Sequence, residues 1–418
     1  MTIPHPPHTA GQGGPHALPK PRWQQRIDKA KSVKRQMASM PGFAGAPPQA
    51  PTVGDCLGLC LPVEFPDVPA TIAREEIDAF CNQPGYSGFG NNGSVFDYYL
   101  DNSGGKLRYK TVVAPYYTAS QPRSHYTDEA VAQGQRSAEL VREAVEHHRA
   151  NGLDFSRFSV DAAKAIRATN LLYAGPVVNT FAQGLWPHAA TVPGGVPAGA
   201  GRSVADFQVS AMADALKLGV YCHENGHMLC DFPDLYQFGS VRAGCGSYCL
   251  MSFGAVADER NPPQIGAYLK FKAGWAMPQM IARGQSFTAS AAGNRCFMLQ
   301  KNATEYFLIE FRQRAGRDAA LPGEGLAVWH VDELGSNTDP DSADAAHRHY
   351  ECALIQADGR NDLAGGNDGD DSDLFGPTAQ PVFPPHARPS SLWWDGSASG
   401  LQISAIRAVA GGLEFTVA

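Results

Sequence analysis

Charged residues are sparse in this 418-residue chain, and their balance is acidic. Asp, Glu, Lys and Arg make up 18% of the residues, below the roughly one quarter typical of soluble domains. The formal net charge of -7 argues against nucleic acid as a partner, because binding to phosphates requires a basic surface. Long hydrophobic runs are also lacking, and no stretch approaches the roughly 20 apolar residues that span a bilayer. We therefore expect no transmembrane segment.

The N-terminal segment lacks the features of an export signal. Residues 1–19 are rich in Pro, Gly and His and contain no apolar segment like that of a secretory signal peptide. Either the protein is not exported by that route, or the signal lies outside this chain.

The chain has nine cysteines but lacks paired C-x-x-C motifs. Four of them crowd into 28 residues, namely Cys222, Cys230, Cys245 and Cys249. These four are either small buried thiols or partners in a disulfide that anchors the neighbouring helix. A cysteine–zinc site is a third interpretation, and the missing C-x-x-C pairs argue against it.

The pattern of residues divides the chain into three parts. Residues 1–52 are predicted to be a disordered or pro-segment-like leader and linker, with a basic, solvated helix from Lys20 to Met37. Residues 53–284 alternate predicted helices and strands, which is typical of a mixed α/β domain. Residues 285–418 contain short strands separated by turns, which predicts a sandwich-like all-β module. The predicted fold class is therefore α+β.

Hydrophobic periodicity locates the expected elements. In the α/β domain it predicts strands at 59–65, 107–113 and 170–174, and helices at 72–80, 94–100, 127–150, 212–229 and 264–274. In the β module it predicts strands at 297–300, 305–311, 325–331, 350–356, 401–405 and 413–417.

A possible catalytic motif lies in the helix predicted at 212–229. His223 and His227 are four residues apart, so on a helix both imidazoles project from one face and can share a metal ion. Glu224 follows the first histidine and can act as general base on a water that the metal activates. By itself, a match of five residues can also arise from two surface histidines on an ordinary helix.

The residues after this helix supply a candidate third ligand. Phe232 precedes Pro233 and is pushed away from the helical region, so Asp234 lies in a chain that has already turned back. Asp231 forms an i, i+8 column with His223, and on a continuous helix the two would be about 12 Å apart, too far to share one zinc ion. Asp231 is instead expected to cap the turn or face solvent.

Several ordered motifs resemble the immune inhibitor A-like metallopeptidases, a family of secreted bacterial zinc proteases of the metzincin group. The resemblance runs from about Leu59 to the C-terminus and is carried by Pro62–Asp67, Ser94–Tyr99, Ser103–Leu107, Leu185–His188, His223–Tyr236, Glu305–Arg312, Gly325–Asp332 and Ser399–Ile403. It also includes the segment 246–254, which resembles the methionine turn beneath the zinc site of metzincins.

This resemblance implies roles for individual residues. His223, His227 and Asp234 would be the zinc ligands, Glu224 the general base and Met251 the residue of the methionine turn. It also implies a metzincin-like catalytic domain, protein or peptide substrates and an extracellular location, although the lack of a signal peptide keeps a cytoplasmic location open.

The sequence departs from the family pattern at the end of the helix. Cys230 stands where the family has a glycine, and Asp234 comes one residue late, so the turn must be built differently. Glu259 is therefore kept as an alternative third ligand. His188 and His330 match family motifs, and we expect them to serve packing or hydrogen bonding rather than zinc.

An acidic, glycine-rich loop in the β module suggests a second cation. Its carboxylates suit calcium, which takes roughly 6–8 oxygen ligands in irregular geometry, and a solvated acidic loop is the alternative. The candidate ligands are Asp358, Asp362, Asp368, Asp370, Asp371 and Asp373.

The sequence as a whole predicts a zinc-dependent endopeptidase that hydrolyses peptide bonds in proteins. The competing function is that of a catalytically degenerate protein that uses its β module to bind a surface or a protein partner. The intact His-Glu-x-x-His motif argues against degeneracy, since loss of catalysis would readily remove Glu224.

Overall fold

The computed structural model describes residues 20–38, 52–238, 244–341, 344–378, 382–383 and 388–418, and the remaining predicted leader residues lie outside these ranges. Helices and several sheets alternate in a mixed α/β fold, in agreement with the predicted α+β class. The chain forms two compact units, and most of the first lies in residues 54–233 and most of the second in residues 234–418. Among the described residues, no helix has the length and apolar character needed to cross a membrane.

The first unit is built on a six-stranded sheet with the order β2-β1-β4-β6-β5, to which β3 is added beside β1. All pairings are parallel except that of β5, which runs antiparallel to β6 at the edge of the sheet. The strands are β1 (Gly54–Glu64), β2 (Leu107–Val113), β3 (Tyr117–Thr118), β4 (Thr169–Tyr173), β5 (His188–Gly199) and β6 (Arg202–Ala211).

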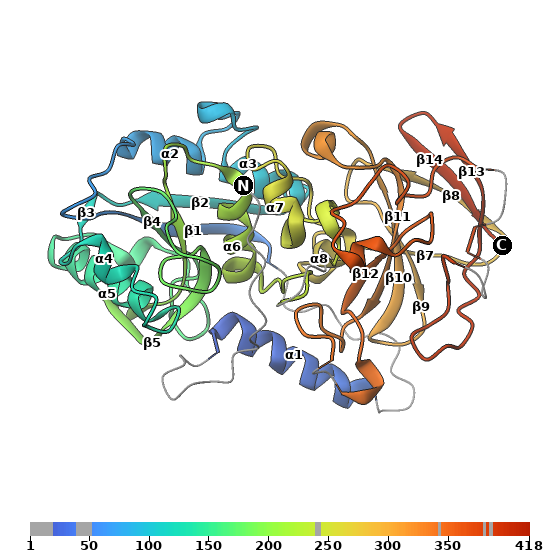
Figure 1. Cartoon of the computed structure of the whole chain (residues 1–418), viewed down its shortest axis with the longest axis horizontal. Coiled ribbons are helices and arrows are strands. Elements are labelled where there is room, and N and C mark those ends of the chain that lie inside the picture. Colours follow the sequence, from blue (N-terminus) through green and yellow to red (C-terminus); the bar gives the residue numbers. More distant parts are fainter. Residues whose placement is uncertain (1–19, 39–51, 239–243, 342–343, 379–381, 384–387) are drawn as a thin grey trace. The chain divides into compact units, whose positions relative to one another are not determined.

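Helices cover both faces of this sheet. On one face, α5 (Gln135–Ala150) buries Leu140 and Val141 in a core shared with Leu61 of β1. On the other face, Cys81 of α2 (Arg74–Asn82) lies 3.8 Å from the Tyr221 hydroxyl of α6 (Leu218–Cys230). Because both faces are covered, every residue of β4 is buried, as is typical of parallel strands. Figure 1 shows β1, β2 and β4 as neighbouring strands with α5 beside them.

The second unit contains two antiparallel sheets apart from one short parallel pair. The five-stranded sheet has the order β12-β11-β10-β9-β7 and the three-stranded sheet the order β13-β14-β8. Side chains from both sheets form one hydrophobic core, as the predicted sandwich-like module requires. The strands are β7 (Gln279–Met280), β8 (Gln285–Ser290), β9 (Phe297–Gln300), β10 (Glu305–Arg312), β11 (Gly325–Asp332), β12 (Cys352–Ile355), β13 (Ile403–Val409) and β14 (Gly412–Val417).

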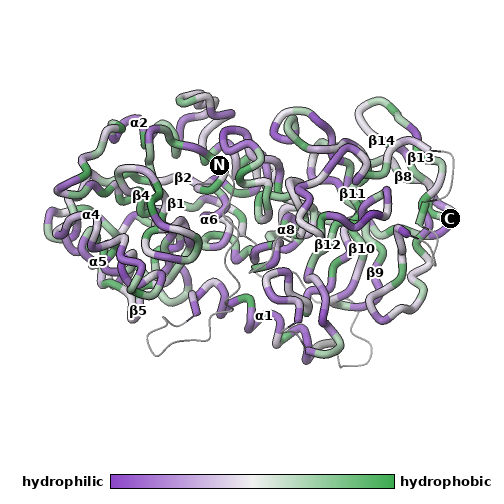
Figure 2. Tube along the Cα trace, viewed as in Figure 1, coloured by the Kyte–Doolittle hydropathy of each residue, from purple (hydrophilic) through white to green (hydrophobic). Residues whose placement is uncertain are grey.

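The remaining helices are short except α1. They are α1 (Arg22–Ala38), α3 (Val95–Asn102), α4 (Arg123–Tyr126), α7 (Ala255–Ala257) and α8 (Ala267–Lys272). Figure 2 shows that α1 is mostly hydrophilic, as the basic sequence suggested. The prediction of a solvated helix holds only in part, because Ile27 and Lys34 are buried while the other described side chains are exposed or half-buried.

Two predicted helices begin much later than expected. The helix predicted from Thr127 begins at Gln135, after Gly134 in the left-handed conformation with a φ of 87°. The helix predicted from Met212 begins at Leu218, since the Met212 amide donates to the Tyr173 carbonyl and extends the sheet instead. In both cases a tertiary contact or a turn overrides local helix propensity.

Strands β5 and β6 were not predicted, and the expected domain boundary differs from the division of the structure. Strand β5 contains Pro197 and consecutive glycines at 194 and 195, and its register with β6 shifts twice, so its residues do not alternate regularly. The sequence changes character near residue 285, whereas the two compact units divide after Pro233.

Candidate metal centre

The motif lies on α6, which is buried along nearly its whole length. All residues from Tyr221 to Cys230 are buried, including His223, Glu224 and His227. A helix of this kind needs its polar side chains satisfied internally, because unpaired polar groups are costly to bury.

A chain of buried polar side chains holds α6 against the sheet. Gln208 Nε2 donates to Asn170 Oδ1 over 3.0 Å, and Asn170 Nδ2 donates to the Tyr109 hydroxyl over 2.9 Å. The Tyr109 hydroxyl in turn donates to Asn225 Oδ1 over 3.0 Å. Asn225 is the central residue of the motif and is fully buried, so the network fixes the rotation of the helix that carries both histidines. This role of Asn225 was not predicted from the sequence.

The helix ends in a turn that differs from the glycine turn of the resembled family. Asp231, rather than Cys230, adopts the left-handed conformation, with φ 54° and ψ 38°. Its amide donates to the carbonyls of Gly226 and His227, and the Phe232 amide also donates to Gly226. Aspartate tolerates this conformation better than most residues, and the expectation that Asp231 caps the turn agrees with this geometry.

The same turn sets the tautomer of His227. His227 Nδ1 lies 2.6 Å from the Phe232 carbonyl oxygen. A carbonyl only accepts, so Nδ1 carries the proton and Nε2 presents its lone pair, as a metal ligand must. His227 Nε2 lies 3.2 Å from His223 Nε2. Two ligands at about 2.0–2.1 Å on a tetrahedral zinc ion are roughly 3.3 Å apart, so the spacing fits.

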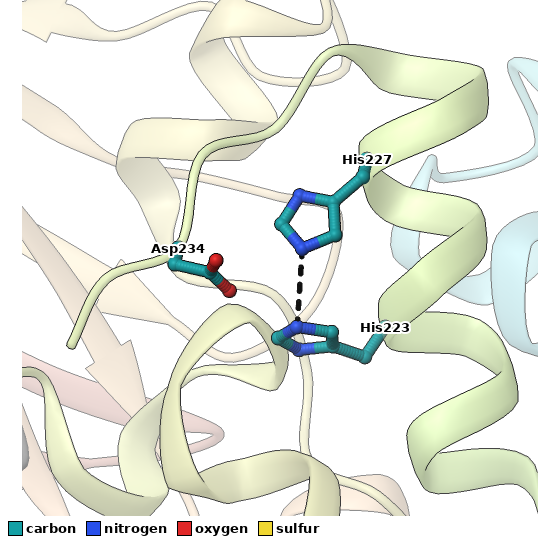
Figure 3. Close-up of side chains that lie close together, drawn as sticks. All are labelled: His223, His227 and Asp234. Carbon is teal, nitrogen blue, oxygen red and sulfur yellow. Dashed lines mark hydrogen bonds between the residues drawn. The ribbon is translucent and has the colours of Figure 1, made fainter. Parts of the chain in front are cut away.

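Asp234 completes a set of three candidate ligands. Its carboxylate and the two imidazoles offer ligand atoms that all lie within 4.8 Å of one another (Figure 3). The three residues come from one continuous stretch of chain, and all are buried. Two imidazoles and one carboxylate form a suitable donor set for zinc. Glu259 does not belong to this set, and Asp231 forms ion pairs elsewhere.

The segment predicted to be a methionine turn lies next to Asp234 in the fold. The Leu235 amide, which directly follows Asp234, donates to the Met251 carbonyl over 2.7 Å. Met251 is fully buried, and the backbone of Met251 and Ser252 departs from helical geometry within residues Leu250–Gly254. This turn therefore helps to fix the position of the third candidate ligand.

The cysteines are not linked to one another. All nine are free and buried, which favours the interpretation as small buried thiols over that of a disulfide. Burial, followed by the charge of Asp231, raises the pKa of Cys230 well above its usual value. Since zinc binds the thiolate form, Cys230 is a poor ligand.

Helix α1 covers one of the candidate ligands. The indole of Trp23 stacks on the His227 imidazole, with ring centroids 4.5 Å apart and an angle of 24° between the planes. Arg26 donates to both carboxylate oxygens of Asp231 and to Asp206, over 2.7–2.9 Å. The Arg22 amide donates to Thr191 Oγ1 on the edge strand β5. These contacts were not predicted from the sequence. The single tryptophan in an otherwise basic helix is the feature that could have indicated that the helix packs against another part of the chain.

The acidic loop brings only part of the predicted calcium set together. Asp358, Asp370 and Asp373 offer ligand atoms within 4.8 Å of one another. The guanidinium of Arg360 pairs with Asp358 over 2.6 Å and with Asp370. Arg360 thus provides positive charge at the place where a cation would bind. The Asp362 side chain accepts from Gln356 and Asn367 instead, and Asp368 and Asp371 lie outside the group. Calcium binding by this loop stays a prediction.

His188 and His330, which lie in the other motifs that resemble the family, form hydrogen bonds, as expected. His188 Nε2 lies 2.9 Å from Ser137 Oγ, and burial lowers the pKa of this imidazole to about 4. His330 Nε2 lies 3.2 Å from Glu305 Oε1, and its ring stacks on Trp394.

No protein-family model matches the chain, and no curated protein is similar to it at a significant level.

Proposed function

We propose that this protein is a zinc-dependent endopeptidase with His223, His227 and Asp234 as metal ligands. The observation that carries the proposal is the pair of imidazole Nε2 atoms 3.2 Å apart, with the Asp234 carboxylate beside them. All three side chains are buried, and the Phe232 carbonyl selects the tautomer of His227. Both features support a preorganised site.

The chain's own residues have separate tasks in this proposal. A zinc ion held there would lower the pKa of a water molecule and polarise the scissile carbonyl group. Glu224 takes the proton from the attacking water and passes it to the leaving amine. It precedes Asn225, whose hydrogen bond to Tyr109 holds the helix in place, so the carboxylate is offered from a rigid backbone.

An extended peptide fits the surroundings of the motif. Helix α6 packs against β5 and β6, and β5 forms the edge of the sheet. The free side of an edge strand can pair with an added peptide strand. Such pairing uses main-chain hydrogen bonds, which suits an enzyme that cleaves within protein chains.

Metal analysis combined with a casein assay tests the proposal. The purified chain should contain zinc and hydrolyse casein, and a chelator should abolish the activity until zinc is restored. Glu224→Gln should keep the zinc while turnover falls by about 10²-fold or more, because a general base contributes about 10²–10⁴-fold. Glu146→Gln, at an exposed glutamate of α5, is the control and should behave as wild type.

Two results would contradict the proposal in different ways. Wild-type hydrolysis by Glu224→Gln would remove Glu224 from the mechanism. A zinc-loaded wild-type chain without hydrolytic activity would instead favour the degenerate binding protein.

A further inference from the structure

A second cluster of histidine and aspartate lies in the β-rich unit and shares no residue with the centre described above. Asp332 is the last residue of β11, and its Oδ2 atom lies 2.6 Å from His347 Nδ1 and 2.7 Å from His349 Nε2. The three side chains offer ligand atoms within 4.8 Å of one another. Two imidazoles therefore converge on a single carboxylate oxygen.

The surroundings position the Asp332 carboxylate and orient the ring of His349. The Asp332 side chain is only 3% exposed, and its other oxygen, Oδ1, accepts from the Leu334 amide over 3.1 Å. The His349 ring stacks on Trp394 with centroids 4.4 Å apart and an angle of 6° between the planes. Trp394 stacks in the same way on His330. The carboxylate and one imidazole are thus preorganised by residues that are not themselves candidate ligands.

A cavity of about 630 Å³ adjoins the cluster. His349, Trp393, Trp394 and Arg348 are among the residues that line it. A ligand set of only three residues leaves a coordination position for water or another small ligand, and the cavity provides access at His349.

We propose that Asp332, His347 and His349 form a second metal site that binds a divalent transition ion of the zinc class. Imidazole nitrogen suits zinc, copper, nickel and iron, whereas calcium and magnesium prefer sites built from oxygen alone. The donor set of two imidazoles and one carboxylate therefore selects the first group. Nothing in this inference depends on the peptidase activity.

Metal binding requires a small outward movement of the histidines. Ligand atoms on a tetrahedral zinc ion are roughly 3.3 Å apart, compared with the present 2.6 and 2.7 Å. The side chains of His347 and His349 are 23% and 11% exposed. Both lie on the segment between β11 and β12, where such a movement does not disturb the sheet.

The alternative is that the two imidazoles only donate hydrogen bonds to Asp332, and a pair of substitutions separates the two roles. In His347→Asn the amide nitrogen stands near the position of Nδ1, and in His349→Gln it stands near that of Nε2. Both amides can still donate to Asp332, but neither is a good zinc ligand. A purely structural hydrogen-bonding role would survive these changes.

The experiment counts zinc in the full chain after equilibration with a zinc buffer and removal of loosely bound metal. The doubly substituted chain should bind one zinc ion fewer than wild type, and zinc should raise its melting temperature less. Arg348→Ala is the matched control, because Arg348 lies between the two histidines, is exposed and has no usual metal-ligating atom. Calcium and magnesium should not replace zinc.

A second chain, with both His223 and His227 changed to Gln, isolates the new site. It should bind one zinc ion whether or not the peptidase proposal holds. Equal zinc content in wild type and the His347→Asn/His349→Gln chain would overturn the inference, as would the absence of zinc from the His223→Gln/His227→Gln chain. A wild-type chain that lacks hydrolytic activity while the second site is loaded would count against the peptidase proposal alone.

Discussion

Helix α1 covers His227, and the first prediction concerns the release of this helix from the site. Arg26 holds the start of this helix through hydrogen bonds to Asp231 and Asp206, while Trp23 lies on the imidazole. Trp23 Nε1 also donates to the carbonyl of Ala189 on β5, the edge strand that an extended substrate would use. If the protein is the proposed peptidase, Arg26→Ala should therefore raise its activity.

The expected size of the increase follows from the exposure of the ion pairs. A hydrogen bond to a charged group that is shielded from solvent contributes about 1.5–3 kcal/mol to stability. An exposed ion pair contributes only about 0.2–1 kcal/mol. The Arg26 side chain is 37% exposed, while those of Asp231 and Asp206 are 17% and 6% exposed. We therefore expect Arg26→Ala to remove about 1–2 kcal/mol of the free energy that holds α1 in its docked position. That energy corresponds to a roughly 5- to 30-fold larger undocked population.

The assay is the initial rate of cleavage of a quenched fluorescent peptide by the full chain. The rate should rise by the same factor as long as the docked form predominates. Lys29→Ala is the control, because Lys29 is an exposed cation on the same helix. Trp23→Ala should act in the same direction as Arg26→Ala.

A lower rate would refute this reasoning. Asp231 caps α6, so a purely structural role of Arg26 would loosen the helix end and reduce activity instead. An unchanged rate in both Arg26→Ala and Trp23→Ala would show that α1 does not hinder substrate.

Further predictions concern metal ions and pH. Asp234→Ala should lose the zinc of the proposed catalytic centre while Asp231→Ala keeps it, and the reverse stoichiometry would show that the ligand assignment is wrong. If the acidic loop binds calcium, millimolar calcium should raise the melting temperature, and paired alanines at Asp370 and Asp373 should abolish that rise. Burial alone would raise the pKa of Glu351, but the charges of Lys272 and Lys31, together with hydrogen bonds, lower it to about 2. Its contribution to the free energy of unfolding should be present above about pH 4.5 and be lost as the pH falls toward 2. Glu351→Gln should flatten this part of a pH–stability curve, and an unchanged curve would contradict the assignment.

The sequence predicted the features that depend on local spacing. The interval of four between His223 and His227 places both on one face of a helix, and Pro233 marks where the chain must turn. Both features lie within twelve residues, so helical geometry alone sufficed to favour Asp234 over Asp231. Regular alternation predicted β2, and a short apolar run predicted β9, each with the bounds that the structure shows.

The features that were missed depend on contacts between distant residues. Asn225 meets Tyr109 across 116 positions of the chain, and Arg26 meets Asp231 across 205. No periodicity or spacing within a short window encodes such pairs. Strand β5 was missed for a different reason, because its bulges and glycines interrupt the alternation on which strand prediction depends.

The polar chain from Gln208 through Asn170 and Tyr109 to Asn225 has a consequence for how the sheet assembles. Side chains of a strand alternate between faces, so a slip of one residue in β4 would turn Asn170 toward the apolar face that α5 covers. Gln208 and Tyr109 would then lose Asn170 as a hydrogen-bond partner, at a cost of about 1–3 kcal/mol for each group left unsatisfied. Parallel strands that are buried on both faces have little alternation in hydrophobicity to select one alignment. Here the polar chain penalises misaligned strands, and the alignment that it selects is the one that presents both histidines correctly.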